Sequence, residues 1–143
     1  MTLVDLNLIL YATDAGSVHH ARARAWWDGL LSGQEPVGVC WLVLNGFIRL
    51  TTHPRILQRP LAVPDAVARV DAILARPSVR ILEPTPEHWS IYRRYLAQSI
   101  HGGNLANDAY LAALAYTHGA VIASADADFA RFKEIVWVNP VAA

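Results

Sequence analysis

The sequence predicts an α/β fold in which helices cover both faces of a mainly parallel sheet. Short apolar segments typical of strands alternate with longer segments typical of helices, as in chains of β–α–β units. The 143 residues are 54% hydrophobic and only 17% charged, so the chain can bury a substantial core and is not of the disordered class. We therefore expect one domain spanning residues 1–143.

Two strands and three helices are expected in the first half of the chain. Ser17 is a favourable N-cap for the second helix, whose inward face is expected to carry Ala25, Trp26 and Leu30. Gly33 is expected to end that helix. The expected elements are a strand at Thr2–Asp5, a helix at Leu6–Thr13, a helix from Ser17 to about Leu31, a strand at Pro36–Cys40 and a helix at Trp41–Thr52.

The second half opens with a proline-rich connection over residues 53–64, which is expected to be exposed. Pro86 suits the first turn of a helix, and Gly119 suits a helix C-terminus. Gly102 and Gly103 predict a turn. The expected elements are a helix at Asp65–Arg76, a strand at Val79–Leu82, a helix from Thr85 to about Ser99, a helix at Asn104–His118, a strand at Ala120–Ser124, a short helix at Ala127–Phe132 and a strand at Ile135–Val138.

Composition excludes several classes of function. Twelve basic and twelve acidic residues cancel, which argues against a general cationic coat for nucleic acid but allows a local basic groove. The single cysteine, Cys40, excludes an internal disulfide, and no Cys/His spacing resembles a zinc site. No segment approaches the length of a membrane span and the N-terminus has no secretory pattern, so we expect a cytoplasmic protein.

Aspartates stand at the junctions between expected strands and helices. Asp5 follows the first strand, Asp108 begins an apolar helical segment, and Asp126 follows a later strand, with Asp128 two residues on. In parallel α/β folds these junctions gather at one edge of the sheet, where active sites lie. Carboxylates that share a cleft repel one another unless a cation neutralises them, so the pattern predicts a divalent-metal site.

Each aspartate alone is equally well explained as a residue that stabilises a helix N-terminus. The set favours a metal site, because Ser, Thr and Asn would cap as well as Asp. Asp108 heads a helix with no other formal charge before its end, so its carboxylate needs a partner. Asp128 is a weaker ligand candidate than Asp126. Asn7 and Ser124 are neutral candidates to support the ligands, although turn and cap roles explain them too.

Four segments, in this order and at these separations, make the chain resemble a PIN-domain ribonuclease, most closely the VapC toxins of bacterial toxin–antitoxin systems. The resemblance covers almost the whole chain. It is carried by the segments Val4–Asn7, Leu42–Arg49, Asn107–Ala115 and Ser124–Phe129.

The resemblance implies a PIN-like three-layer α/β/α sandwich and Mg²⁺- or Mn²⁺-dependent cleavage of single-stranded or looped RNA, such as tRNA or rRNA. It implies catalytic and metal-binding roles for Asp5, Asp108 and Asp126, with Asp128 beside them. A homodimer and a VapB-type antitoxin that blocks the acidic pocket are implied as well. Phosphodiester hydrolysis needs an activated water and a counterion for developing negative charge, and bound metal supplies both.

One position departs from the family. Many PIN domains carry a glutamate in the helix after the second strand, where this chain has Asn45. The change predicts weaker metal affinity, a one-metal site or an active variant subgroup. Glu83 is a candidate for compensation, although exposure in a loop explains it better. Arg49 lies one helical turn after Asn45, so it is expected to neutralise an aspartate, to contact an RNA phosphate or to form a structural ion pair.

Basic and aromatic side chains offer further candidates for RNA contact. Arg55, Arg59, Arg93 and Arg94 are expected either to contact phosphates or to be solvated surface charges. The five tryptophans could stack on unpaired bases, but most are expected in the core.

Two other functions compete with the nuclease. The first is a PIN-like module that lost efficient catalysis at Asn45 and acts by binding antitoxin or RNA. The second is a phosphoryl-transfer enzyme or phosphatase. It is disfavoured because Asp5-Leu6-Asn7 lacks the second aspartate of such nucleophile motifs and no phosphate-binding glycine loop is present.

Overall fold

The computed structural model describes residues 1–98 and 104–143, and its centre is a five-stranded parallel sheet. The strands lie in the order β3-β2-β1-β4-β5, and every neighbouring pair is parallel, which confirms the predicted sheet type. The strands are β1 (Thr2–Val4), β2 (Val37–Val39), β3 (Val79–Ile81), β4 (Val121–Ala123) and β5 (Trp137–Val138).

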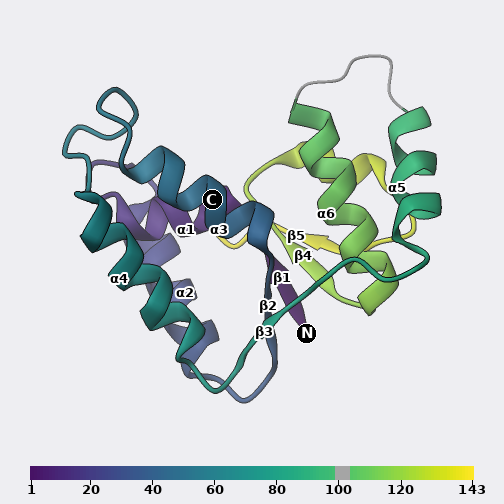
Figure 1. Ribbon diagram of the computed structural model, residues 1–143, viewed down its shortest axis with the longest axis horizontal. Helices are drawn as coiled ribbons and strands as arrows, with labels where there is room; N and C mark the ends of the chain where they lie inside the picture. Colours follow the sequence, from purple (N-terminus) through teal and green to yellow (C-terminus); the bar gives the residue numbers. More distant parts are fainter. Residues whose placement is uncertain (99–103) are drawn as a thin grey trace.

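Helices cover both faces of this sheet and give the three-layer α/β/α arrangement. Figure 1 shows α1 to α4 on one side of the strands and α5 and α6 on the other. The helices are α1 (Leu6–Thr13), α2 (His20–Ser32), α3 (Trp41–Thr51), α4 (Val63–Leu74), α5 (His88–Ala97) and α6 (Asn104–His118), with a short 3₁₀-helix at Ala127–Arg131. The strands β2 and β3 are added on one side of β1, and β4 and β5 on its other side. The end of β1, between β2 and β4, is therefore a topological switch point of the sheet.

The core explains why these segments form these elements. The strands β1, β2 and β4 are covered on both sides, and their residues read as short apolar segments, as buried parallel strands do. Helix α6 is apolar around nearly its whole circumference because it packs between the sheet and α5. It ends at Gly119, whose φ of 65° allows the amide of Ala120 to reach back to the carbonyl of Ala115.

The inward face of α2 differs from the prediction. Ala23, Trp27 and Leu31 are buried, at spacings of four residues, whereas Ala25 is exposed and Trp26 and Leu30 are half-buried. Two adjacent tryptophans allow either register, and packing against α1 selects Trp27. Ser17 does not cap α2, which begins at His20.

Other boundaries shift by a few residues. Ser17 stabilises the turn before α2, where its hydroxyl accepts from the amide of His19. Helix α4 begins at Val63 with Pro64 in its first turn, earlier than predicted, and α5 begins only at His88, after a turn closed by the carbonyl of Thr85. The predicted end of α5 at Ser99 and the turn at residues 102–103 lie outside the described residues.

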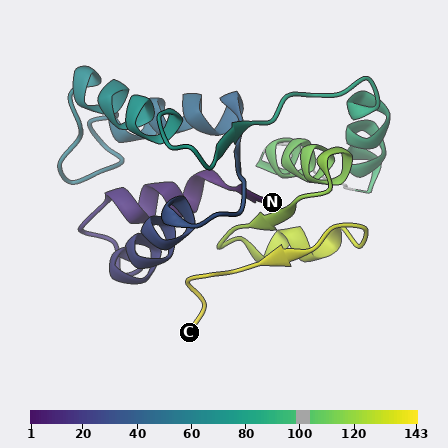
Figure 2. The same cartoon turned by 90° about the horizontal axis from the view of Figure 1, so that it is seen from below.

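The two ends of the chain lie on different parts of the sheet. The N-terminus begins the central strand, while the C-terminal segment leaves β5 and passes toward α2, as Figure 2 shows. There the guanidinium of Arg22 donates to the carbonyl of Ala142. Among the helices of residues 1–98 and 104–143, none combines the length and hydropathy of a membrane span.

Candidate metal centre

Asp5 lies where β1 ends beside β4, at the switch point of the sheet. Its backbone amide donates to the carbonyl of Ala123 at 2.9 Å and so prolongs the β1–β4 pairing by one residue. One carboxylate oxygen, Oδ1, accepts from the amide of Leu6 at 2.7 Å, at the N-terminus of α1. The other, Oδ2, accepts from the hydroxyl of Ser124 at 2.6 Å. Asp5 is therefore held by β1, α1 and the end of β4 together.

Ser124 and Asn7 connect this aspartate to the loop after β4. The Ser124 hydroxyl is fully buried, donates to Asp5 and accepts from Asn7 Nδ2 at 3.2 Å and from the amide of Asp126 at 3.0 Å. The Asn7 carbonyl oxygen accepts from the amide of Ala125 at 3.2 Å. These bonds fix the positions of the two aspartate-bearing segments relative to each other.

Three further carboxylates meet beside Asp5. Asp108 on α6, Asp126 after β4 and Asp128 in the 3₁₀-helix offer oxygens that lie within 4.8 Å of one another. Asp126 Oδ1 accepts from the amide of Asp128 at 2.9 Å, and Asp128 pairs with Arg131 at 3.6 Å. Asp128 belongs to this cluster, but it is exposed and is not among the residues that line the cavity, whereas the half-buried Asp126 is.

The protein environment opposes ionisation of two of these groups. The pKa of Asp108 is raised from 3.8 to about 7, first by burial and then by the charges of Asp126, Asp5 and Asp128, while Arg131 lowers it. Burial also raises the pKa of Asp5, against the lowering effect of the Ser124 and Leu6 hydrogen bonds. Four carboxylates in so small a space need an added positive charge to be ionised together.

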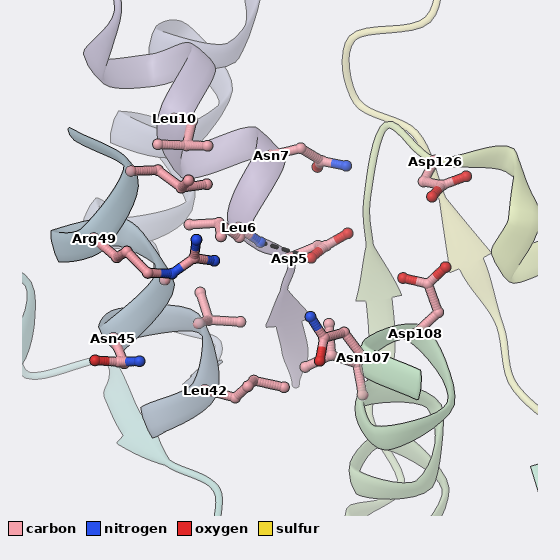
Figure 3. A pocket seen from close by; sticks show the side chains of 14 residues that line it. Asp5, Leu6, Asn7, Leu10, Leu42, Asn45, Arg49, Asn107, Asp108 and Asp126 are labelled. Atoms are coloured by element: carbon pink, nitrogen blue, oxygen red, sulfur yellow. Dashed lines mark hydrogen bonds between the residues drawn. The ribbon is translucent and has the colours of Figure 1, made fainter. Parts of the chain in front are cut away.

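A cavity of about 300 Å³ opens in front of the aspartates, between α1 and α3 on one side and α6 on the other. Figure 3 shows Arg49 extending from α3 toward Asp5, with Asp108 and Asp126 on the opposite wall. The polar side chains that line it belong to Asp5, Asn7, Asn45, Arg49, Asn107, Asp108 and Asp126, and the apolar part is formed by Leu6, Leu10, Leu42, Val43, Gly46, Leu50 and Leu111.

The structure thus brings Asp5, Asp108 and Asp126 to one cleft, as the sequence predicts. It also shows two neighbours to which the sequence interpretation gave no role. Asn107 lines the cavity next to Asp108, and its place in the Asn107-Asp108 segment was the available signal. Arg131 pairs with Asp128 three residues earlier, a spacing typical of helical ion pairs.

Glu83 is not among the residues that line this cavity. It is exposed after β3, and its carbonyl accepts a hydrogen bond from His118. The preferred interpretation of Glu83 as an exposed loop residue is therefore confirmed, and Glu83 does not compensate for Asn45 in this cavity. Asn45 is an exposed residue of the α3 wall, where its uncharged amide adds no negative charge to the cavity.

Candidate RNA-contacting side chains outside the cavity differ in their surroundings. Arg94 pairs with Glu134 at 2.7 Å and lies over the rings of Tyr95 and Tyr116, so its charge is already engaged. Trp41 and Trp89 are more than half exposed, at 54% and 62%. Trp27 is buried and Trp26 and Trp137 are half-buried, so only part of the aromatic set is in the core.

Comparisons with known proteins agree on one family. The sequence model described as the PIN domain matches residues 2–135. Ribonuclease VapC37 of Mycobacterium tuberculosis is 44% identical over 142 residues, covering 99% of each chain. Ribonuclease VapC33 of the same organism is 38% identical over 141 residues, again covering 99% of each chain.

Solved structures show the same fold at low identity. VapC20 of Mycobacterium tuberculosis, described as a Sarcin-Ricin loop cleaving toxin, superposes with a TM-score of 0.68 at 20% identity, covering 92% of this chain and 94% of that one. A chain of VapBC2 from Rickettsia felis, bound to a DNA fragment from its promoter, gives 0.70 at 14% identity, covering 96% and 97%.

Proposed function

This chain belongs to the PIN-domain family, within its VapC ribonucleases, and we propose that it is the metal-dependent endoribonuclease toxin of a toxin–antitoxin pair. The observation that carries the proposal is the convergence of four aspartates at the switch point of the sheet. We infer that residues 1–143 act as one PIN domain in the cytoplasm and hydrolyse phosphodiester bonds in single-stranded or looped RNA.

The side chains present fit a divalent cation. They offer only carboxylate oxygens, the ligands that Mg²⁺ and Mn²⁺ prefer, and the nearly buried Asp108 lacks a basic partner of its own in the described residues. We propose that Asp5, Asp108, Asp126 and Asp128 hold Mg²⁺ or Mn²⁺. When bound, such an ion lowers the pKa of water and neutralises charge on phosphate.

The remaining roles fall to the chain itself. The Ser124 hydroxyl and the Leu6 amide fix the Asp5 carboxylate in position and favour its ionised form, against the larger effect of burial, which raises its pKa. Asn7 fixes the loop that carries Asp126. We propose that RNA enters this open cavity as an unpaired strand, whose backbone can approach the acids without a partner strand.

A small protein partner follows from the same family. The structural neighbours include antitoxin complexes such as VapBC-1 from nontypeable Haemophilus influenzae and FitAB bound to DNA. We propose a VapB-type antitoxin that covers the acidic cavity with a basic side chain, and a homodimer of this chain.

One observation supports a second candidate, a catalytically weakened PIN module that acts by binding antitoxin or RNA. Asn45 gives the α3 wall of the cavity no negative charge. The cavity keeps the carboxylates of Asp5, Asp108 and Asp126 without it, and Asp128 lies beside them, so we favour the active enzyme.

The deciding experiment is cleavage of total cellular RNA with Mg²⁺, Mn²⁺ or chelator by folded, antitoxin-free protein, followed by mapping of the new ends. Wild type should produce discrete metal-dependent cuts that Asp108→Asn abolishes. Calorimetric titration with Mn²⁺ gives an independent readout, in which the variant should bind far more weakly. Tight Mn²⁺ binding without cuts would favour the binding module. If wild type showed neither Mn²⁺ binding nor cuts, the proposed function would be overturned.

A further inference from the structure

Arg49 is the one basic side chain among the residues that line the acidic cavity. It lies in the last turn of α3, is exposed, and extends toward Asp5 in Figure 3. Asn45, one turn earlier on the same helix, stays against α3 in that view. The α3 wall therefore presents a cation, and the facing wall presents carboxylates.

No structural ion pair accounts for Arg49. Within residues 1–98 and 104–143 the ion pairs join Arg24 to Asp28, Arg94 to Glu134 and Arg131 to Asp128, and no hydrogen bond from the Arg49 guanidinium occurs in that part of the chain. An arginine that packs for stability is normally held by a carboxylate or a carbonyl. As far as the described part of the chain shows, all five donors of Arg49 are instead available to a molecule that enters the cavity.

The chemistry of the cavity limits which molecule that is. Carboxylates on one wall repel an anion unless a cation stands between them, whereas a guanidinium on the other wall attracts it directly. A phosphodiester group fits both walls, since it has two non-bridging oxygens that can face opposite sides. The planar guanidinium of arginine can donate two parallel hydrogen bonds to the oxygens of one phosphate group.

On these grounds, and resting on the proposed nuclease function, we propose that Arg49 binds the scissile phosphate of the RNA from the wall opposite the aspartates. As water attacks phosphorus and the bond to the leaving oxygen breaks, negative charge increases on the non-bridging oxygens. The guanidinium then binds more tightly than in the ground state, so Arg49 lowers the barrier as well as positioning the strand.

The test compares variants on an RNA oligonucleotide that spans a cut site mapped with wild type. Arg49→Met should lower kcat/KM roughly 100-fold, and Arg49→Lys, which keeps the charge but loses the fork, roughly 10-fold. Arg69→Met is the matched control, because Arg69 is an exposed arginine of α4 outside the acidic cavity, and it should change little. Mn²⁺ affinity should be unchanged in all three variants.

A second measurement separates phosphate contact from a structural effect. Binding of the same RNA is measured in Ca²⁺, with gels confirming that it stays intact, for the natural linkage and for a neutral methylphosphonate at the cut site. The methylphosphonate should weaken binding by wild type about tenfold more than binding by Arg49→Met. Equal weakening would overturn the inference even if Arg49→Met were slow.

Failure of this inference is distinguishable from failure of the nuclease proposal. Wild type that cuts RNA, together with an Arg49→Met variant that cuts equally well, would overturn only the role of Arg49. Wild type that makes no cuts would remove both. Because Arg49 is exposed and its side chain forms no ion pair or hydrogen bond within residues 1–98 and 104–143, the Met variant should fold. If it does not, both measurements are made with Arg49→Lys.

Discussion

The carboxyl group of Asp108 is kept in surroundings that oppose its charge, and this has a consequence for stability. Its pKa is about 7 in the folded chain, whereas the ordinary value for an aspartate, which applies to the unfolded chain, is 3.8. Between these two pH values the folded protein binds a proton that the unfolded chain has lost. The free energy of unfolding of metal-free protein should therefore fall as pH rises from about 4 to about 7. The sign is opposite to that of a salt-bridged aspartate.

Asp108→Asn should make the metal-free protein more stable at pH 8, by roughly 1–3 kcal/mol, and the gain should shrink toward pH 5. Urea unfolding in chelator at both pH values measures this difference. Asp71→Asn, which changes an exposed aspartate on α4, serves as control and should show no such trend. A destabilised Asp108→Asn variant at pH 8 would show that the carboxylate cluster is not under electrostatic strain.

Ser124 should matter for metal affinity although it cannot be a strong ligand. Ser124→Ala removes the donor to Asp5 and the acceptor of two further hydrogen bonds. We expect Mn²⁺ affinity to fall roughly 10–100-fold, as for other groups that hold metal ligands in place. Titration calorimetry beside Ser90→Ala, an exposed serine of α5, provides the comparison. Unchanged affinity would mean that Asp5 keeps its position without the hydroxyl.

At the scale of residues, the sequence predicted the acidic residues of the site better than the hydrogen bonds that hold them in place. Asp5 and Asp126 follow β1 and β4, where a strand–helix pattern locates them, whereas Asp108 lies inside α6 (Asn104–His118) and not at the end of a strand. The bonds of Ser124 span 119 and 117 residues of chain, to Asp5 and Asn7, and no local pattern records them. The pattern could name Ser124 as a candidate but could not identify its partners.

Among the secondary-structure elements, β2 depends on a glycine. A Cβ at Gly38 would stand 2.8 Å from Leu82 Cδ1 and 3.1 Å from Leu82 Cγ, so the buried Leu82 side chain would have to shift. Gly38→Ala should lower the free energy of unfolding by about 1–3 kcal/mol. Gly29→Ala on α2 meets no atom within 4 Å and should raise it by about 0.5–1 kcal/mol.

Chemical denaturation of the two alanine variants distinguishes a steric effect from a general effect of the substitution. Opposite signs are expected, because the same methyl group is buried at Gly38 and solvated at Gly29. Leu82→Ala in the Gly38→Ala background should recover part of the loss relative to the sum of the single changes. Simple addition of the two losses would show that the contact with Leu82 does not cause the defect.

Element types were more predictable than their limits. The strands β1, β2, β4 and β5 are short apolar segments followed by a polar or small residue, so the alternation of strands and helices could be read directly, although β3 carries the exposed Arg80. The start of α5 and the buried face of α2 depend on tertiary contacts. The Thr85 carbonyl closes a turn before α5, and α1 selects Trp27 over its neighbour Trp26. Local propensity cannot decide between such alternatives.

For the whole molecule, the candidate site is assembled from segments far apart in the chain. Asp5 follows the first strand, Asp108 lies on α6, and Asp126 and Asp128 follow β4. The rule that parallel strands share an active edge could predict that Asp5 and Asp126 meet, whereas Asp108 reaches the same place from within α6. The sequence could not decide the role of Arg49 on the opposite wall of the cavity, because a structural ion pair and a contact with phosphate were equally compatible with its position.

Because the site joins the first strand to the last third of the chain, metal binding should stabilise the entire fold. A ligand present at 100 times its Kd adds about 2.7 kcal/mol, which raises the Tm of a domain of this size by roughly 5–10 °C. We expect such a rise with Mn²⁺ at pH 8 for wild type and for Asp71→Asn, measured by thermal unfolding against chelator. Asp108→Asn should start from a higher Tm and respond little. An equal rise in Asp108→Asn would place the stabilising ion elsewhere, because that variant keeps the fold and lacks only the charge at the centre of the cluster.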